Sequence, residues 1–214
     1  IVSGGGNDTL AGGGGANVLT GNGGADSITG GANNDTITGA AGIDVLDGAA
    51  GDDIFNYATS AEFLASNAVI DTVTGGDGND TIQVTGAITI IAADTMARVG
   101  TVETLAAATQ NSAAKTHSIV IDDAGELGSI TKINLSADTH ATSSGNIVLT
   151  GQSTATVLTG AGGSSSANTL IGGTGADTIT GGAGVDKITG AAGIDVLVGA
   201  AGDDIFSYAT SAEF

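Results

Sequence analysis

A nine-residue repeat is the feature that most constrains how this chain can fold. From Ser3 onward, successive nonapeptides read SGGGNDTLA, GGGGANVLT, GNGGADSIT, GGANNDTIT, GAAGIDVLD and GAAGDDIFN. They share the pattern Gly-Gly-x-Gly-x-Asp-x-apolar-x, and the frame continues through YATSAEFLA, SNAVIDTVT and GGDGNDTIQ. A repeat this short forms one turn and one strand, which bury little surface alone, so neighbouring repeats must stack.

The eighth position of this frame is apolar in every repeat. It holds Leu10, Leu19, Ile28, Ile37, Leu46, Phe55, Leu64, Val73 and Ile82. A three-residue strand directs its middle side chain to one face and its flanking side chains to the other, so position eight lines the interior. Two nonapeptides complete one coil, which predicts an all-β parallel β-roll with two facing sheets. We expect one sheet to carry Leu10, Ile28 and Leu46, and the other Leu19, Ile37 and Phe55.

Glycine and aspartate occupy the turn before each strand. Glycine at positions one, two and four permits positive φ and lets carbonyl oxygens converge, while aspartate at position six adds a carboxylate. Calcium takes six to eight oxygen ligands, carbonyl and carboxylate alike. One turn cannot supply that many, but two turns stacked about 4.8 Å apart can share an ion. The sequence therefore predicts Ca²⁺ as the cofactor, bound between turns.

A second run of nonapeptides spans residues 172–207, after a degenerate lead-in at 151–171. Residues 188–214 repeat residues 37–63 at an offset of 151, with only two differences, Asp47/Val198 and Asn56/Ser207. We expect three segments: a calcium-binding β-roll at 1–83, a β-rich solenoid spacer at 84–150, and a second β-roll at 151–214. The third segment would begin the next copy of a tandem array with a 151-residue period.

The spacer lacks the nonapeptide pattern but is rich in Val, Ile and Thr. The stretches VTGAITIIA, HSIVIDD, ITKINLSAD and NIVLTG predict short strands. Residues 94–110 are ambiguous, because Asp94 could cap a helix whereas Gly100 and Thr101 disfavour one. We favour strand there.

The nonapeptides resemble the RTX (repeats-in-toxin) family of calcium-binding β-roll proteins, whose motif is GGxGxDxUx with U a large aliphatic residue. The resemblance covers residues 3–56, 75–83 and 172–207. It implies a right-handed parallel β-roll, calcium-induced folding and type I secretion from Gram-negative bacteria. It also implies a set of metal ligands: Asp8, Asp26, Asp35, Asp44, Asp53, Asp80, Asp177, Asp186, Asp195 and Asp204.

Several positions depart from the motif. Asn17 and Asn168 replace the sixth-position aspartate, which would weaken a site by removing a charge. The second glycine is replaced by alanine at Ala40, Ala49, Ala191 and Ala200, which predicts weaker binding in those turns. Asp71 has the sixth position but no preceding glycines, so we leave it out of the expected ligands.

Charge and composition exclude several functions. The formal net charge is −19, from 23 acidic and 4 basic residues, and nucleic acid is excluded as a partner because phosphate binding needs clustered Lys and Arg. No stretch of roughly 18 apolar residues exists, so we expect no membrane insertion. Aromatic residues make up only 3% of the chain, which indicates a thin interior of small aliphatic side chains.

Candidate catalytic groups are sparse. His117 and His140 have no partner at a metal-binding spacing, so we expect both on the surface. Glu103 and Glu126 are isolated, which predicts solvated side chains, and Asp138 lies outside the repeat frame. With no nucleophile constellation and no phosphate-binding loop, we expect that the chain is not an enzyme.

The first interpretation is a calcium-binding structural repeat unit of a secreted bacterial surface protein. The resemblance to RTX-type S-layer and adhesin proteins and the 151-residue period favour an S-layer component, adhesin stalk or filament at the cell surface. Its partners would be other copies of itself in an array, fibre or lattice.

The alternative is the RTX repeat region of a secreted enzyme or toxin, such as an alginate epimerase module, a metalloprotease or a cytolysin. The few basic residues disfavour a grip on an anionic polysaccharide, although threonines on the strands leave polysaccharide or ice binding open as a third alternative.

Overall fold

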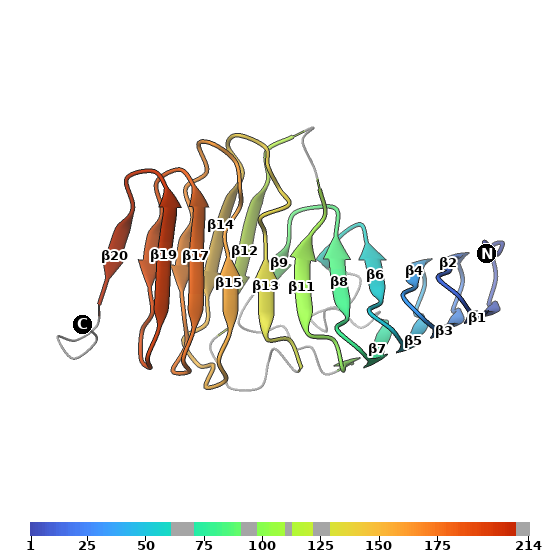
Figure 1. The fold of residues 1–214 in the computed structure, drawn as a ribbon. Coiled ribbons are helices and arrows are strands. Elements are labelled where there is room, and N and C mark those ends of the chain that lie inside the picture. Colours follow the sequence, from blue (N-terminus) through green and yellow to red (C-terminus); the bar gives the residue numbers. More distant parts are fainter. Residues whose placement is uncertain (61–70, 91–97, 110–112, 122–128, 209–214) are drawn as a thin grey trace. The chain divides into compact units, whose positions relative to one another are not determined.

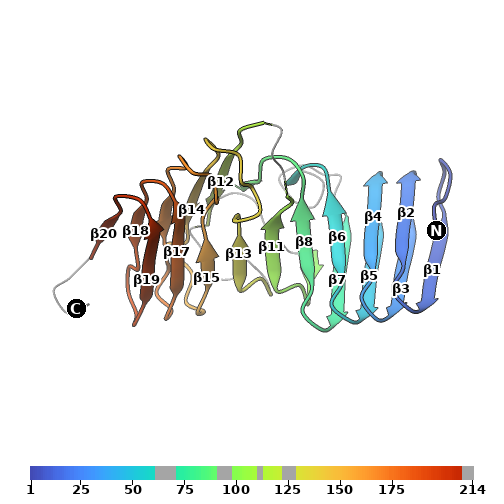
Figure 2. The same cartoon turned by 45° about the horizontal axis from the view of Figure 1, so that its top comes forward.

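The computed structural model describes residues 1–60, 71–90, 98–109, 113–121 and 129–208, and all its described elements are strands (Figures 1 and 2). The first eleven are β1 (Thr9–Gly14), β2 (Val18–Gly23), β3 (Ser27–Ala32), β4 (Thr36–Ala41), β5 (Val45–Ala50), β6 (Ile54–Tyr57), β7 (Thr72–Asp77), β8 (Thr81–Val84), β9 (Thr89–Ile90), β10 (Val99–Gly100) and β11 (Thr104–Ala107). The next nine are β12 (Thr116–Val120), β13 (Lys132–Asn134), β14 (Ser144–Val148), β15 (Val157–Thr159), β16 (Thr169–Ile171), β17 (Thr178–Ala183), β18 (Lys187–Thr189), β19 (Val196–Ala201) and β20 (Ile205–Ser207).

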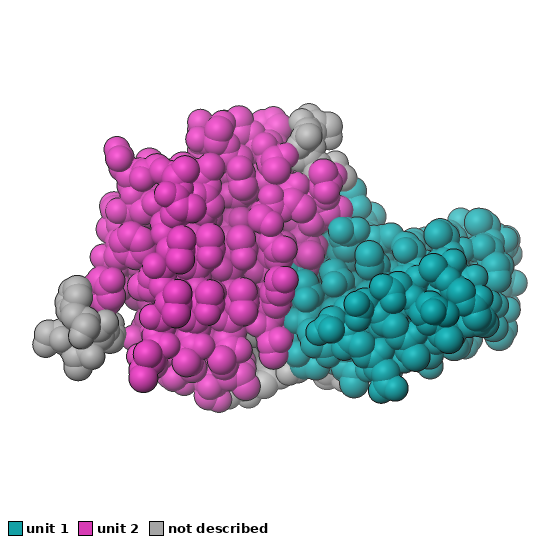
Figure 3. Space-filling model, in the orientation of Figure 1, with its two compact units in different colours: residues 1–85, 94–105, 128–130 teal, residues 86–93, 106–127, 131–214 magenta. Residues whose placement is uncertain are grey.

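The strands belong to two compact units (Figure 3). The first comprises residues 1–85, 94–105 and 128–130 and contains the first nonapeptide run. The second comprises residues 86–93, 106–127 and 131–214 and contains the second run. The division of the sequence into three segments stays a prediction.

The first unit is a parallel β-roll whose strands alternate between two sheets. One sheet has the order β1-β3-β5-β7-β10, and the other contains β2, β4, β6 and β8 as successive neighbours. The register aligns Leu10, Ile28, Leu46 and Val73 in one sheet and Leu19, Ile37, Phe55 and Ile82 in the other. All eight side chains are buried. Both interior walls predicted from position eight are therefore confirmed, and so is the all-β fold class.

One coil of the first unit is longer than the sequence pattern predicts. Leu46 pairs with Val73 and Phe55 pairs with Ile82, so both steps span 27 residues where the earlier steps span 18. β5 thus pairs directly with β7, and β6 with β8. Leu64, expected as an interior residue of the intervening repeat, lies outside the described residues.

The second unit is built in the same way. One sheet has the order β20-β18-β16-β14-β12-β9, and β13, β15, β17 and β19 are successive neighbours in the other. Ile119, Ile147, Leu170, Ile188 and Phe206 align across the first of these sheets. The stacking thus continues where the nonapeptide pattern is absent, because the apolar residue in the middle of each strand is retained while the loops vary in length.

In the described residues, the spacer segments expected to be strands contain β9, β12, β13 and β14. Of residues 94–110, the structure describes 98–109, and these contain β10 and β11, which confirms strand for the described part. Within the described ranges, no helix has the length and apolarity needed to cross a bilayer.

Candidate metal sites between stacked turns

The turns before the strands depend on left-handed backbone at the second and fourth positions. Gly31 at position two has φ of 120° and Asn33 at position four has φ of 75°. Position one never has a positive φ in the nonapeptides described, so the expectation of positive φ at that glycine was wrong. The alanines at position two, Ala40, Ala49, Ala191 and Ala200, have φ between 72° and 76°. Each of these conformations costs roughly 1–2 kcal/mol for a residue with a Cβ, so the alanine turns are strained.

Glycine is needed at position one because oxygen atoms fill the space that a side chain would occupy. A Cβ on Gly30 would lie 2.5 Å from Asp35 Oδ2 and 2.7 Å from the carbonyl oxygen of Gly48. The same two kinds of atom, a sixth-position carboxylate oxygen and the first-position carbonyl of the next coil, meet at Gly21, Gly48, Gly172 and Gly181. Each turn thus brings a carboxylate and a neighbouring coil's carbonyl to one point.

The sixth-position carboxylates of the first unit form two ladders along the stacked turns. In each step, one Oδ1 accepts the backbone N–H of the sixth-position residue in the preceding coil at 2.7–2.8 Å. One ladder contains Asp8, Asp26, Asp44 and Asp71, and the other Asn17, Asp35, Asp53 and Asp80. In the second unit, Asp195 accepts from Asp177 at 2.9 Å and Asp204 from Asp186 at 3.0 Å.

The second oxygen of most of these carboxylates is buried and has no hydrogen-bond donor. This holds for Oδ2 of Asp26, Asp35, Asp44, Asp53, Asp80 and Asp186, in residues that are at most 2% exposed. A buried carboxylate oxygen without a partner is costly, and the carbonyl oxygens beside it repel it. A hard cation would supply the missing partner, since calcium binds carboxylate and carbonyl oxygens together. The residues present therefore fit calcium.

The pKa values of these aspartates also reflect the cost of burying a carboxylate beside other oxygens. Burial raises the pKa of Asp44, Asp53, Asp177 and Asp186, and the charge of a neighbouring aspartate adds to it in each case. Burial raises the pKa of Asp80 to about 6, against the lowering effect of its hydrogen bond from the Asp53 amide. Without a cation, these carboxylates hold a proton more readily than exposed ones do.

Asn168 shows how one layer satisfies the same oxygens without a cation. Its Oδ1 accepts the backbone N–H groups of Gly145 at 2.7 Å and Ala161 at 3.0 Å. Its Nδ2 donates to the carbonyls of Ala161 at 3.2 Å and Gly181 at 3.1 Å, and to Asp186 Oδ1 at 2.9 Å. Gly181 occupies the first position of the nonapeptide one coil further along. The amide nitrogen of Asn168 therefore bonds the kind of carbonyl that lies beside an unpartnered carboxylate oxygen in other layers. The turns thus present acceptors that require a donor or a cation.

Comparison with protein families finds the RTX calcium-binding nonapeptide repeat (4 copies). It matches residues 2–37, 29–58, 66–84, 162–197 and 184–208, more than half of the chain. The chain belongs to the RTX calcium-binding nonapeptide repeat family. No curated protein and no solved structure matches it.

Seven of the ten aspartates expected as ligands are buried in these RTX turns: Asp26, Asp35, Asp44, Asp53, Asp80, Asp177 and Asp186. The other three, Asp8, Asp195 and Asp204, are half-exposed, and the strands that follow them lie at sheet edges or next to them. In the described part of the chain, no three His, Asp or Glu side chains gather in one cluster. An ion in an RTX turn would therefore draw mainly on backbone carbonyls, and the ligand set stays a prediction.

Two residues that the sequence argument set aside belong to the ladders. Asp71, whose Oδ1 accepts the Asp44 amide at 2.8 Å, has the sixth position before β7 although no glycines precede it. Glu103 accepts the Asp80 amide at 2.8 Å, so it is not the isolated, solvated carboxylate expected. Asp71 could have been recognised from the sequence, because it lies two residues before Val73, which the strand register confirms as an interior residue.

His117 is fully buried, so the expectation of a surface position was wrong. Its Nε2 lies 3.0 Å from Oδ2 of Asp138, which is also buried, and its Nδ1 accepts the backbone N–H of Ile88 at 3.1 Å. Because strand side chains alternate, His117 shares the inward face with Ile119 and Ile121, and that alternation was visible in the sequence. Asp138, although it lies outside the repeat frame, is therefore part of the spacer's interior.

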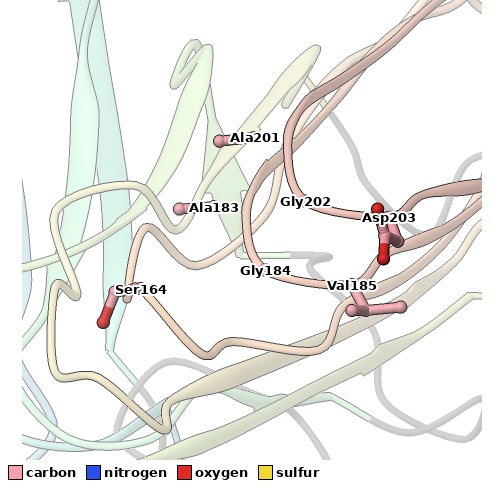
Figure 4. Close-up of a pocket in the computed structure, with 7 residues that line it drawn as sticks. All are labelled: Ser164, Ala183, Gly184, Val185, Ala201, Gly202 and Asp203. Atoms are coloured by element: carbon pink, nitrogen blue, oxygen red, sulfur yellow. The ribbon is translucent and has the colours of Figure 1, made fainter.

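A shallow pocket of the second unit lies beside the RTX turns. Ser164 and Asp203, its two residues with polar side chains, lie on opposite sides of it (Figure 4). None of the expected ligands lines it. Its lining residues are Ser164, Ala183, Gly184, Val185, Ala201, Gly202 and Asp203.

Proposed function

We propose that this RTX chain is a calcium-binding structural repeat unit of a secreted bacterial surface protein. An S-layer component, an adhesin stalk or an extracellular filament would each use it as a calcium-stiffened rod segment. The observation that carries the proposal is the buried, unpartnered Oδ2 repeated at Asp26, Asp35, Asp44 and Asp53. Oδ2 of Asp26, Asp35 and Asp53 lies beside the first-position carbonyl oxygen of the next coil, and Oδ2 of Asp44 lies beside the first-position glycine of its own turn. An ion bound there would join consecutive coils.

The two copies of the 27-residue repeat support assembly with other copies of the chain. Phe55 and Tyr57 are 0% and 2% exposed because β8 pairs with β6 and covers them. The equivalent residues, Phe206 on β20 and Tyr208 just after it, are 39% and 41% exposed. A strand that paired with β20, from a following repeat or from another copy, would bury both side chains in the same way. Contacts between unlike ends do not close into small rings and therefore favour a fibre or lattice.

Asp35→Asn tests the metal sites. The change keeps the acceptor for the Asn17 amide, removes the charge and supplies an N–H near the Gly48 carbonyl, as Asn168 does in its own layer. We expect the variant to bind at least one calcium ion fewer in titration calorimetry. We also expect its calcium-free form to be more stable by roughly 1–3 kcal/mol, because an unpartnered buried charge is gone.

Asp47→Asn is the matched control, since it removes the same charge from the outward face of β5, where the second copy has Val198. It should leave the number of bound ions unchanged. Equal losses in the two variants would mean that calcium does not bind at position six.

Phe206→Ser tests the assembly. In calcium, the wild-type chain is expected to form fibres or larger oligomers in sedimentation and electron microscopy. Losing the burial of one aromatic side chain should weaken association about tenfold or more. Val157→Ser, at an outward side chain that is 41% exposed in the middle of a sheet, serves as the control and should change little. A chain that stays monomeric in calcium at every concentration, or a catalytic domain on the same reading frame, would favour the enzyme or toxin alternative.

A further inference from the structure

Glu103 occupies the place of a sixth-position aspartate although it belongs to no nonapeptide. It directly precedes β11, and Leu105, two residues later, is fully buried in the same way as the apolar residue at position eight. Its Oε2 accepts the Asp80 amide at 2.8 Å, the distance at which Asp80 Oδ1 accepts the Asp53 amide. Glu103 is therefore the next step of the Asp35–Asp53–Asp80 ladder.

Thr101 takes the place of the first-position glycine in the same layer. In the preceding layer, Asp53 Oδ2 and the Gly75 carbonyl meet at Gly48. At Gly75, the corresponding atoms are Asp80 Oδ2 and the carbonyl oxygen of Thr101. Thr101 has a left-handed backbone with φ of 50°, and its Oγ1 accepts the Gly76 amide at 2.9 Å. The two groups are five residues apart in a nonapeptide and two apart here, so a different chain path reproduces the same arrangement of oxygens.

Asp80 Oδ2 is the independent sign that this arrangement needs a ligand. Asp80 is fully buried, and its Oδ2 has no hydrogen-bond donor, although the Thr101 carbonyl lies beside it. We propose that Asp80, the Thr101 carbonyl and Glu103 hold a hard divalent cation, calcium by its ligand chemistry, at a site that leaves the nonapeptide motif. Carboxylate and carbonyl oxygens, without nitrogen or sulfur, suit hard cations such as calcium.

This site closes the row of cation sites on its side of the first unit. In the layer beyond Glu103 a hydroxyl replaces the carboxylate, since Ser129 Oγ accepts the Val102 amide at 2.8 Å and donates to the Val102 carbonyl at 2.8 Å. A neutral hydroxyl that both accepts and donates a hydrogen bond requires no cation. The inference rests on the proposed function in one respect, namely that calcium occupies the turns at all.

The test compares Glu103→Gln with Asp77→Asn in the full chain. Glutamine keeps an acceptor for the Asp80 amide and removes the charge, while Asp77 is an exposed acid in the repeat that contains Asp80. Calcium binding is counted by equilibrium dialysis, and circular dichroism in calcium checks the fold. We expect Glu103→Gln to bind one ion fewer than the wild type and Asp77→Asn to bind the wild-type number.

A second measurement on the wild type does not depend on the variant folding. Gadolinium substituted for calcium should broaden the amide signals of Thr101, Val102 and Glu103 in nuclear magnetic resonance spectra. Two results would overturn the site and leave the proposed function standing, provided that the wild type binds calcium. One is an equal number of bound ions in the two variants; the other is sharp signals at these residues while the Asp35 signal is broadened. A wild type that binds no calcium would overturn both.

Discussion

In excess EDTA at pH 7, this chain is expected to lose most of the β-structure of its nonapeptide runs and to recover it in millimolar calcium. Most of the buried turn carboxylates have one oxygen that lacks a donor, and these oxygens repel the carbonyls beside them when no cation is present. The net charge of −19 opposes compaction, and ordering glycine-rich turns costs conformational entropy. Loss of several ions together should therefore exceed the marginal stability of a domain this size.

A calcium titration followed by circular dichroism measures this effect. The spacer strands should respond least, because β12 and β14 are held by the buried His117–Asp138 pair and by Asn168, which need no ion. Hydrogen exchange should accordingly show residual protection at Ile119 and Ile147 in EDTA. A spectrum that does not change across the titration would refute calcium-driven folding.

Acid should partly replace calcium. In the calcium-free folded chain, the pKa of Asp80 is raised from 3.8 to about 6, and those of Asp44, Asp53, Asp177 and Asp186 are raised in the same direction. Between about pH 4 and 6 the folded state therefore binds more protons than the unfolded state, so stability in EDTA falls as the pH rises. For Asp80 alone the difference in stability between pH 4 and pH 7 is about 2 kcal/mol.

Calcium should reverse the sign of this dependence. Calcium binds the ionised carboxylate, so protons compete with the ion and the calcium-loaded chain loses stability on acidification. In EDTA, circular dichroism should show more retained β-structure at pH 4.5 than at pH 7, whereas in calcium the melting temperature should be higher at pH 7 than at pH 4.5. Asp80→Asn should flatten the EDTA profile. The same direction of change in both solutions would contradict this account.

The interior of the roll was predictable because it depends on local pattern alone. Position eight fixed Leu10, Ile28 and Leu46 as one wall, since a strand's alternation holds wherever the strand lies. The number of layers was not predictable, because a sequence pattern cannot show whether the strand of a given repeat pairs with those of its neighbours. The repeat around Leu64 continues the frame, yet the sheets step from Leu46 directly to Val73.

The candidate sites were predictable where one turn carries its own signature. Glu103 and Thr101 were missed because they reproduce the arrangement of oxygens through a shorter segment without glycine at the matching positions. The sequence predicted that glycine lets oxygen atoms converge, but it did not show that at position one these oxygens come from Asp35 and Gly48, which belong to two different coils. Contacts between residues of different coils cannot be predicted from the pattern within a single repeat.

Anomalous diffraction from crystals grown in calcium, or in terbium as its substitute, tests the central claim most directly. We expect rows of peaks along the turns, each about 2.3–2.6 Å from a sixth-position carboxylate oxygen and from carbonyls of adjacent coils. Asp26, Asp35, Asp44 and Asp53 should each contact one of these peaks through Oδ2. Peaks confined to exposed acids such as Asp52 and Asp77, with Oδ2 of Asp35 still lacking a partner in a calcium-saturated crystal, would contradict this claim.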